Sequence, residues 1–118
     1  MTTRIIKGKC GENLAAEYLE KKGFTIIEKN WRYSRLGEID IIAADNDSLV
    51  FVEVKTRTSQ AFGHPIEAIS PQKLRTIQKL AEMYMMNNNI KKYERFRIDV
   101  VGILTGNPAT ITHITDVF

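Results

Sequence analysis

The sequence predicts an α/β domain in which helices flank a mixed β-sheet, with elements in the order αβββαββ. Two segments have the apolar spacing of helices, and five other short segments are rich in Val, Ile and Phe. Clusters of Gly, Pro and Asn separate the segments, as turns do. A length of 118 residues suits one domain, which we expect to span residues 1–118.

The first half of the chain contains one helix and three strands. The helix is expected at Lys9–Lys22, because Gly23 is a residue that commonly ends helices. A strand is expected at Thr25–Trp31. The stretch Gly37–Arg57 is expected to form a hairpin of two further strands.

The second half contains one helix and two strands. Ser70 and Pro71 form a favourable start for a helix, as its N-cap and its first residue. We expect this helix to continue to about Met86, where three asparagines follow. The last strands are expected at Phe96–Leu104 and Thr110–Asp116.

Composition excludes several classes of protein. Hydrophobic residues make up 43% and charged residues 26%, as in soluble globular proteins. Neither a membrane-spanning apolar run nor a secretory signal is recognisable, so we expect a cytoplasmic protein without a membrane partner. Cys10 is the only cysteine and therefore makes no internal disulfide.

Basic residues gather around the hairpin, although the formal net charge is only +3. A phosphate backbone is attracted to such a cluster. A solvated basic face is an equal alternative. The cluster contains Lys29, Arg32, Arg35, Lys55, Arg57, Lys73, Arg75 and Lys79.

The hairpin places charged residues among apolar ones. Side chains alternate across a strand, so every second residue shares a face. In the first strand, Glu38 and Asp40 are expected on one face and Ile39 and Ile41 on the other. In the second strand, one face is expected to carry Leu49, Phe51, Glu53 and Lys55, and the other Val50, Val52 and Val54.

Turn length sets the register of the hairpin. A two-residue turn at Asn46-Asp47 pairs Asp45 with Ser48, and a four-residue turn pairs Ala44 with Leu49. Both turns give the same register. In that register Asp40 faces Glu53 and Glu38 faces Lys55, with Cβ atoms roughly 4.5–5.5 Å apart. A three-residue turn would break the pairing.

Opposed carboxylates need a compensating charge. Like charges directly opposite each other destabilise a hairpin, and burial increases the cost. A Mg²⁺ ion held by Asp40 and Glu53 would provide it, with Lys55 beside Glu53 to hold a water or neutralise a phosphate. The alternative is a wet face on which the charges are solvated.

A fourth acid lies in the first helix. Glu12 shares a helical face with the small residues Gly8, Ala15 and Ala16 and with Leu19. It is therefore a candidate to approach the sheet near Asp40 and Glu53. The equal alternative is that Glu12 stabilises the positive N-terminus of the helix.

This set of residues resembles the site pattern of the PD-(D/E)XK nuclease superfamily. The pattern is an acid on the first helix, an Asp in one strand and an E-x-K triplet in the next, here Glu12, Asp40 and Glu53-Val54-Lys55. The resemblance implies a restriction-endonuclease-like core, and the chain order is similar to that of archaeal Holliday junction resolvases. Ile39 stands where the superfamily's name has Pro.

A narrower resemblance covers nearly the whole chain. The stretches GENLAAEYLEKKGF, NWR, GEIDIIA, LVFVEVKTR, FGHPIEA and RIDVV resemble the YraN-like family of small bacterial proteins.

The superfamily resemblance implies a metal-dependent endonuclease that hydrolyses phosphodiester bonds, with DNA, branched or structured, as the expected substrate. Asp40, Glu53, the carbonyl of Val54 and Glu12 would then bind Mg²⁺ or Mn²⁺. Lys55 would orient the attacking water. Glu38 is a further candidate for the site.

Candidate DNA-binding residues come from the basic cluster and from the second helix, where the superfamily often has a polar residue. They are Arg32, Arg35, Arg57, Gln72 and Lys73. Two alternatives stay open: a nucleic-acid-binding or partner-recruiting module without turnover, and a structural or metal-storage protein. The oligomeric state also stays open, although cutting a two-fold junction would favour a homodimer.

Some residues have two interpretations. Asp99 is expected to pair with Arg97 or Arg57. Trp31 either anchors the core at a strand end or stacks on a base. His64 is either solvated in its loop or touches a phosphate.

Overall fold

The computed structural model describes residues 3–58, 67 and 69–118, with side-chain surroundings from residue 11 onward. The predicted element order αβββαββ is confirmed. The elements are α1 (Thr3–Lys21), β1 (Thr25–Tyr33), β2 (Gly37–Asp45), β3 (Ser48–Arg57), α2 (Pro71–Asn87), β4 (Arg95–Leu104) and β5 (Thr110–Ile114).

The boundaries differ from those expected at several ends. Helix α1 begins at Thr3 instead of Lys9, and β1 continues to Tyr33. Strand β5 ends at Ile114. The start of α2 is confirmed, because the Ser70 side chain accepts a hydrogen bond from the Lys73 N–H at 3.0 Å.

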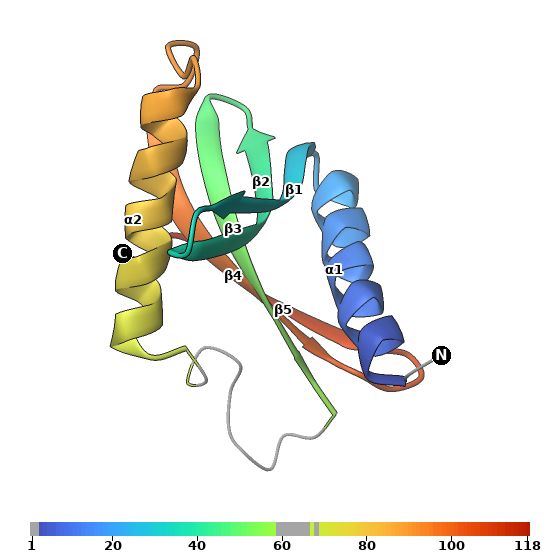
Figure 1. Cartoon of the computed structure of the whole chain (residues 1–118). Coiled ribbons are helices and arrows are strands. Elements are labelled where there is room, and N and C mark those ends of the chain that lie inside the picture. The colour runs from blue at the N-terminus through green and yellow to red at the C-terminus, as the bar shows by residue number, and fades with distance from the viewer. Residues whose placement is uncertain (1–2, 59–66, 68) are drawn as a thin grey trace.

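The five strands form one mixed sheet in the order β1-β2-β3-β4-β5. Neighbouring strands are antiparallel except β3 and β4, which are parallel because α2 connects them. Helix α1 covers one face and α2 the other (Figure 1). No helix in the described part of the chain is long and apolar enough to cross a membrane.

Each helix buries its apolar face against one side of the sheet, which gives two cores. The α1 core contains Ala15, Ala16, Leu19, Phe24, Ile41, Ala43, Val50, Val52, Val101 and Ile103. The α2 core contains Ile39, Ile42, Leu49, Phe51, Ile77, Leu80, Ala81, Tyr84 and Ile98.

Gly11 lets α1 approach the end of β3. A Cβ atom at this position would collide with Thr56 Oγ1 and would lie 3.3 Å from Thr56 Cβ. Thr56 cannot rotate freely away, because a β-branched side chain is stiff. A glycine is therefore required here for close packing of the helix on the strand.

We expect Gly11→Ala to lower the free energy of unfolding by about 1–3 kcal/mol, as overpacking does. The same change in an open helix would raise stability by roughly 0.5–1 kcal/mol. Urea denaturation of Gly11→Ala, Thr56→Ala and the double variant measures the coupling. An equal cost with and without the Thr56 side chain would contradict the steric explanation.

A charged residue is completely buried between β4, β5 and the chain end. Asp99 is 0% exposed and accepts hydrogen bonds from Arg97 Nε and from the Asp116 N–H, both at 3.0 Å. His113 Nε2 lies 2.8 Å from its other oxygen. Burial alone would raise the pKa of Asp99, but these three partners hold it below its ordinary value.

Two of the partners of Asp99 also form contacts with β2 and α1. Arg97 Nη2 donates to Asp45 at 3.0 Å, and His113 Nδ1 lies 3.2 Å from the Tyr18 hydroxyl on α1. Of the two partners expected for Asp99, the structure has Arg97. The group joins α1 and β2 to β4 and β5.

Candidate functional site

The hairpin of β2 and β3 has the predicted register. Asn46 adopts φ 55° in a two-residue turn, and Asp45 pairs with Ser48. The ladder continues to the pair Ile41 and Val52, where it ends. The expected ladder pairs farther along, Asp40 with Glu53 and Glu38 with Lys55, therefore do not form.

The two strands separate at Asp40, where a side-chain oxygen of β2 accepts a hydrogen bond from the backbone of β3 in place of a ladder partner. Asp40 Oδ2 accepts the backbone N–H of Val54 at 2.8 Å. Ile41 packs in the α1 core, whereas Ile39 packs in the α2 core. The prediction that Ile39 and Ile41 share a face is wrong, because β2 leaves the regular alternation where the carboxylate replaces a ladder partner.

Glu53 lies on the predicted face of β3 and is only 4% exposed. Its Oε2 atom lies 3.8 Å from Lys55 Nζ and 3.8 Å from Lys73 Nζ. Lys55 therefore contacts Glu53 on its own strand, and the expected ion pair with Glu38 is replaced. Lys73 comes from the first turn of α2 and brings that helix to the site.

Asp40 and Glu53 are close despite the ended ladder. Burial, the charge of Glu53 and a side-chain hydrogen bond with Glu53 together raise the pKa of Asp40 to about 7. Glu38 adds to this rise, while the Val54 N–H opposes it. Asp40 therefore keeps its proton to a higher pH than an ordinary aspartate does.

Glu12 joins the acidic group from α1. Its pKa is raised by partial burial and by the charges of Asp40 and Glu38, while a hydrogen bond from Asn30 and the charge of Lys29 oppose the rise. Asn30, in the Asn-Trp-Arg stretch, is thus a site residue that the sequence pattern does not identify.

The position of Glu12 decides between its two interpretations. Helix α1 begins at Thr3 and has no acid in its first turn, so Glu12 is too far along to stabilise the N-terminus. It follows Gly11, where the helix lies closest to Thr56 of β3. Gly8 lies outside the residues whose surroundings are described.

Metal ligands at this site would be few. Among the described residues, no group of three or more His, Cys, Asp and Glu side chains is arranged to hold a metal ion. Asp40, Glu53 and the Val54 carbonyl would leave other positions to water and phosphate. Mg²⁺ accepts such sets, with one or two carboxylates.

The candidate DNA-binding residues divide between the surface and the site. Arg32 and Arg35 are exposed around the β1–β2 turn, and Gln72 is exposed on α2. Arg57 is partly buried, and its Nε atom has no hydrogen-bond partner within the described residues. It follows Lys55 by two residues, so both lie on one face of β3.

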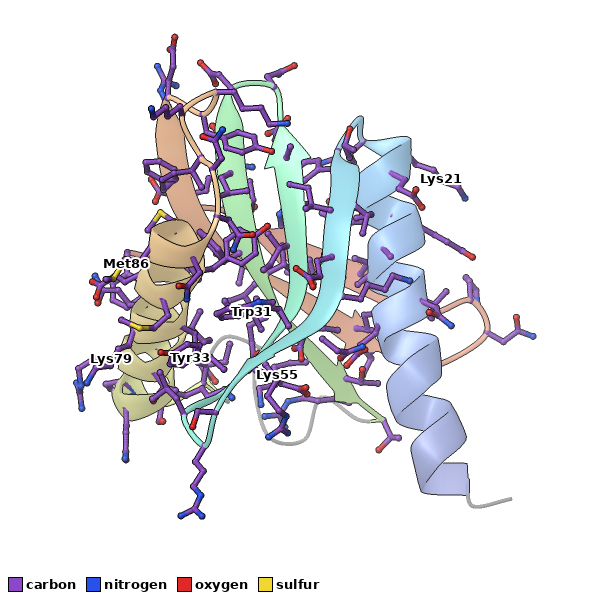
Figure 2. All side chains as sticks on the ribbon, turned by 45° about the horizontal axis from the view of Figure 1, so that its top comes forward. Lys21, Trp31, Tyr33, Lys55, Lys79 and Met86 are labelled. Atoms are coloured by element: carbon purple, nitrogen blue, oxygen red, sulfur yellow. The ribbon has the colours of Figure 1, made fainter. Side chains whose placement is uncertain are left out.

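Trp31 anchors the core, as one of its two interpretations predicts. It packs against the α2 core and meets the Tyr84 ring edge to face at 5.3 Å. Tyr33 stacks on it at 6.0 Å between ring centres. Figure 2 shows Trp31, Tyr33 and Lys55 between the two helices. His64 lies outside the described residues.

Fold and geometry define an α/β protein whose acidic side chains meet where β2 and β3 separate, compatible with a nuclease-like core. The chain belongs to the Uncharacterised protein family UPF0102, whose sequence model matches residues 11–103. The resemblance to the YraN-like family is thereby confirmed.

Relatives from distant bacteria are similar over nearly the whole chain. A UPF0102 protein of Mycobacterium sp. (strain JLS) is 43% identical over 98% of this chain and 87% of its own. One of Persephonella marina is 45% identical over 96% of this chain and 93% of its own. One of Rhodococcus opacus is 44% identical, and both chains are covered completely.

Proposed function

We propose that this protein is a metal-dependent endonuclease that hydrolyses phosphodiester bonds in DNA, with branched or structured DNA as substrate. The observation that carries the proposal is the meeting of Asp40 and Glu53 in the opening between β2 and β3, with Lys55 beside them. A partly buried carboxyl group whose pKa is raised by a neighbouring carboxylate is a place where a divalent cation can replace the proton.

The donor set fits Mg²⁺ or Mn²⁺. Asp40, Glu53 and the carbonyl of Val54 are the oxygen ligands that such ions prefer. When bound, the ion supplies Lewis acidity toward the phosphate and favours the ionised form of water.

The other side chains act on the phosphate and the water. Lys55 and Lys73 bring two ammonium groups to Glu53, where they offset charge that develops on a phosphate. Glu12, which has a raised pKa, positions the attacking water and accepts a proton from it.

One observation favours a second candidate, a nucleic-acid-binding or partner-recruiting module without turnover. Lys55 and Lys73 both lie 3.8 Å from Glu53 and partly neutralise its charge. In this alternative the lysines hold the acids in place structurally and DNA, or a partner protein, binds at the basic surface.

Calorimetric titration of Mg²⁺ and Mn²⁺ tests the first candidate. We expect the wild type to bind the ions and the Asp40→Asn/Glu53→Gln variant to lose binding, because both carboxylate ligands become neutral amides. Glu17→Gln/Asp47→Asn is the matched control, since it makes the same chemical changes at exposed positions.

Cleavage is measured in parallel on a four-way junction, a flap, a duplex and a single strand. We expect wild type and control to cut at least one substrate, and the site variant to bind DNA without cutting. Equal DNA binding by all three proteins with no cleavage under either metal would support the binding module instead.

A further inference from the structure

A groove runs along the polar side of α2, at the edge of the α2 core. It has a volume of about 480 Å³ and lies between α2 and Leu36 of the β1–β2 turn. Arg75 and Lys79 line it, together with Gln72 and Thr76. We call it the α2 groove.

The two cations of the α2 groove are available to a ligand. Both are exposed, and within the described residues neither forms a salt bridge. Lys79 projects from α2 away from the sheet (Figure 2). Glu82, which also lines the groove, follows Lys79 by one turn and limits the basic part at that end.

Helical spacing places the polar groups in a row. Gln72, Arg75 and Lys79 are separated by three and four residues and therefore share one face of α2. A rise of about 1.5 Å per residue puts Arg75 and Lys79 about 6 Å apart along the axis. Phosphates of one DNA strand follow each other every ~3.4 Å along the duplex, so each cation reaches a different phosphate.

The row begins beside the candidate site. Gln72 adjoins Lys73, which lies 3.8 Å from Glu53 Oε2. From there α2 runs away from the acids toward Asn87. A strand bound at the acids therefore has a continuous polar path along the helix.

We propose that the α2 groove binds the phosphodiester backbone of the substrate strand on one side of the cut. The inference rests on the proposed function and extends it, because it assigns Arg75 and Lys79 to phosphates that are not cleaved. These contacts would fix the position of the strand along the site, since a helix face is rigid. Sequence would not be read, because phosphate contacts carry no base information.

The test measures how affinity for DNA depends on salt. The probe is a fluorescein-labelled 20-base-pair duplex in EDTA, and binding is followed by anisotropy across a range of NaCl. Each phosphate contact contributes about 0.9 to the slope of log K against log salt. We expect Arg75→Gln/Lys79→Gln to reduce the slope by about 1.8.

Two further variants serve as controls. Lys21→Gln/Lys91→Gln removes two exposed positive charges elsewhere and should leave the slope within experimental error of wild type. Arg75→Lys/Lys79→Arg keeps both charges and should restore the wild-type slope. Thermal unfolding of every variant verifies that each is folded.

Two outcomes would overturn the inference. Equal loss of slope in the groove variant and in the Lys21/Lys91 control would mean that only net charge matters. If Asp40→Asn/Glu53→Gln then still abolished cleavage, the proposed function would stand without the groove. No salt-dependent DNA binding by the wild type would overturn both.

Discussion

Asp40→Asn is expected to make the metal-free protein more stable while removing its activity. Burial and Glu53 raise the pKa of Asp40 to about 7, so its charged form is unfavourable in the folded protein. Asparagine is uncharged, has nearly the same shape and still accepts the Val54 N–H. Each tenfold difference in proton affinity corresponds to about 1.4 kcal/mol, so we expect a gain of about 2–4 kcal/mol at pH 8.

The gain should depend on pH in a defined direction. Below the ordinary pKa of 3.8, Asp40 is protonated in both states and the variant has no advantage. As pH rises from 3.8 to about 7, the unfolded chain releases the proton more readily, and the stability of the wild type falls relative to that of the variant. Above about pH 7 the difference is constant.

Urea denaturation in EDTA between pH 4 and pH 8 measures this difference. Asp47→Asn makes the same change at an exposed position and should alter stability by less than about 0.5 kcal/mol. Addition of Mg²⁺ should stabilise the wild type and the Asp47→Asn control but not Asp40→Asn, because a ligand that binds the folded state raises its stability. If Asp40→Asn were less stable than wild type at pH 8, the Asp40 carboxylate would not destabilise the folded protein.

Asp99→Ala is expected to cause the largest loss of stability. Removing the carboxylate leaves Arg97 without one of its partners, and leaves His113 Nε2 and the Asp116 N–H without theirs at a position that is 0% exposed. Breaking a buried charge pair typically costs about 3–5 kcal/mol. The free energy of unfolding of a whole domain is roughly 5–15 kcal/mol, so the variant should be close to unfolding at 37 °C.

The loss should fade in acid. The pKa of Asp99 lies below its ordinary value of 3.8, so its stabilising contribution is full above that pH and disappears as pH falls through the folded-state pKa. Urea denaturation at pH 7 and pH 3 should therefore show a smaller difference at pH 3. Glu17→Ala, an exposed acid on α1, is the control, and a cost at pH 7 no larger than that of Glu17→Ala would contradict the prediction.

Local chemistry explains why the hairpin could be predicted from sequence. The residues between Asp45 and Ser48 favour a tight turn, and the turn fixes the register as far as Ile41 and Val52. The N-cap of α2 was predictable for the same reason, since Ser70 and Pro71 act within one turn.

Features that depend on distant groups could not be predicted in this way. Strict alternation places Ile39 and Ile41 together, but β2 leaves the regular alternation where the Asp40 side chain accepts the backbone N–H of Val54. The contact of Lys73 with Glu53 depends on how α2 packs on the sheet. Periodicity contains no information on either contact.

The partnership of Asp99 with His113 needed the tertiary structure as well. His113 lies on β5, and its approach to Asp99 depends on the register of the β4–β5 hairpin and on how its side chain turns toward the buried carboxylate. The sequence did indicate Arg97, because it is two residues from Asp99 and therefore on the same face of one strand.

The parallel pairing of β3 with β4 also bears on how the protein folds. The acids of the hairpin are close in sequence and can meet early, because a short loop costs little entropy to close. Lys73 reaches Glu53 only when α2 packs on the sheet, and parallel pairing across such a long connection forms slowly. We therefore expect the two carboxyl groups to meet while the site is still open to water, before the lysine from α2 reaches them.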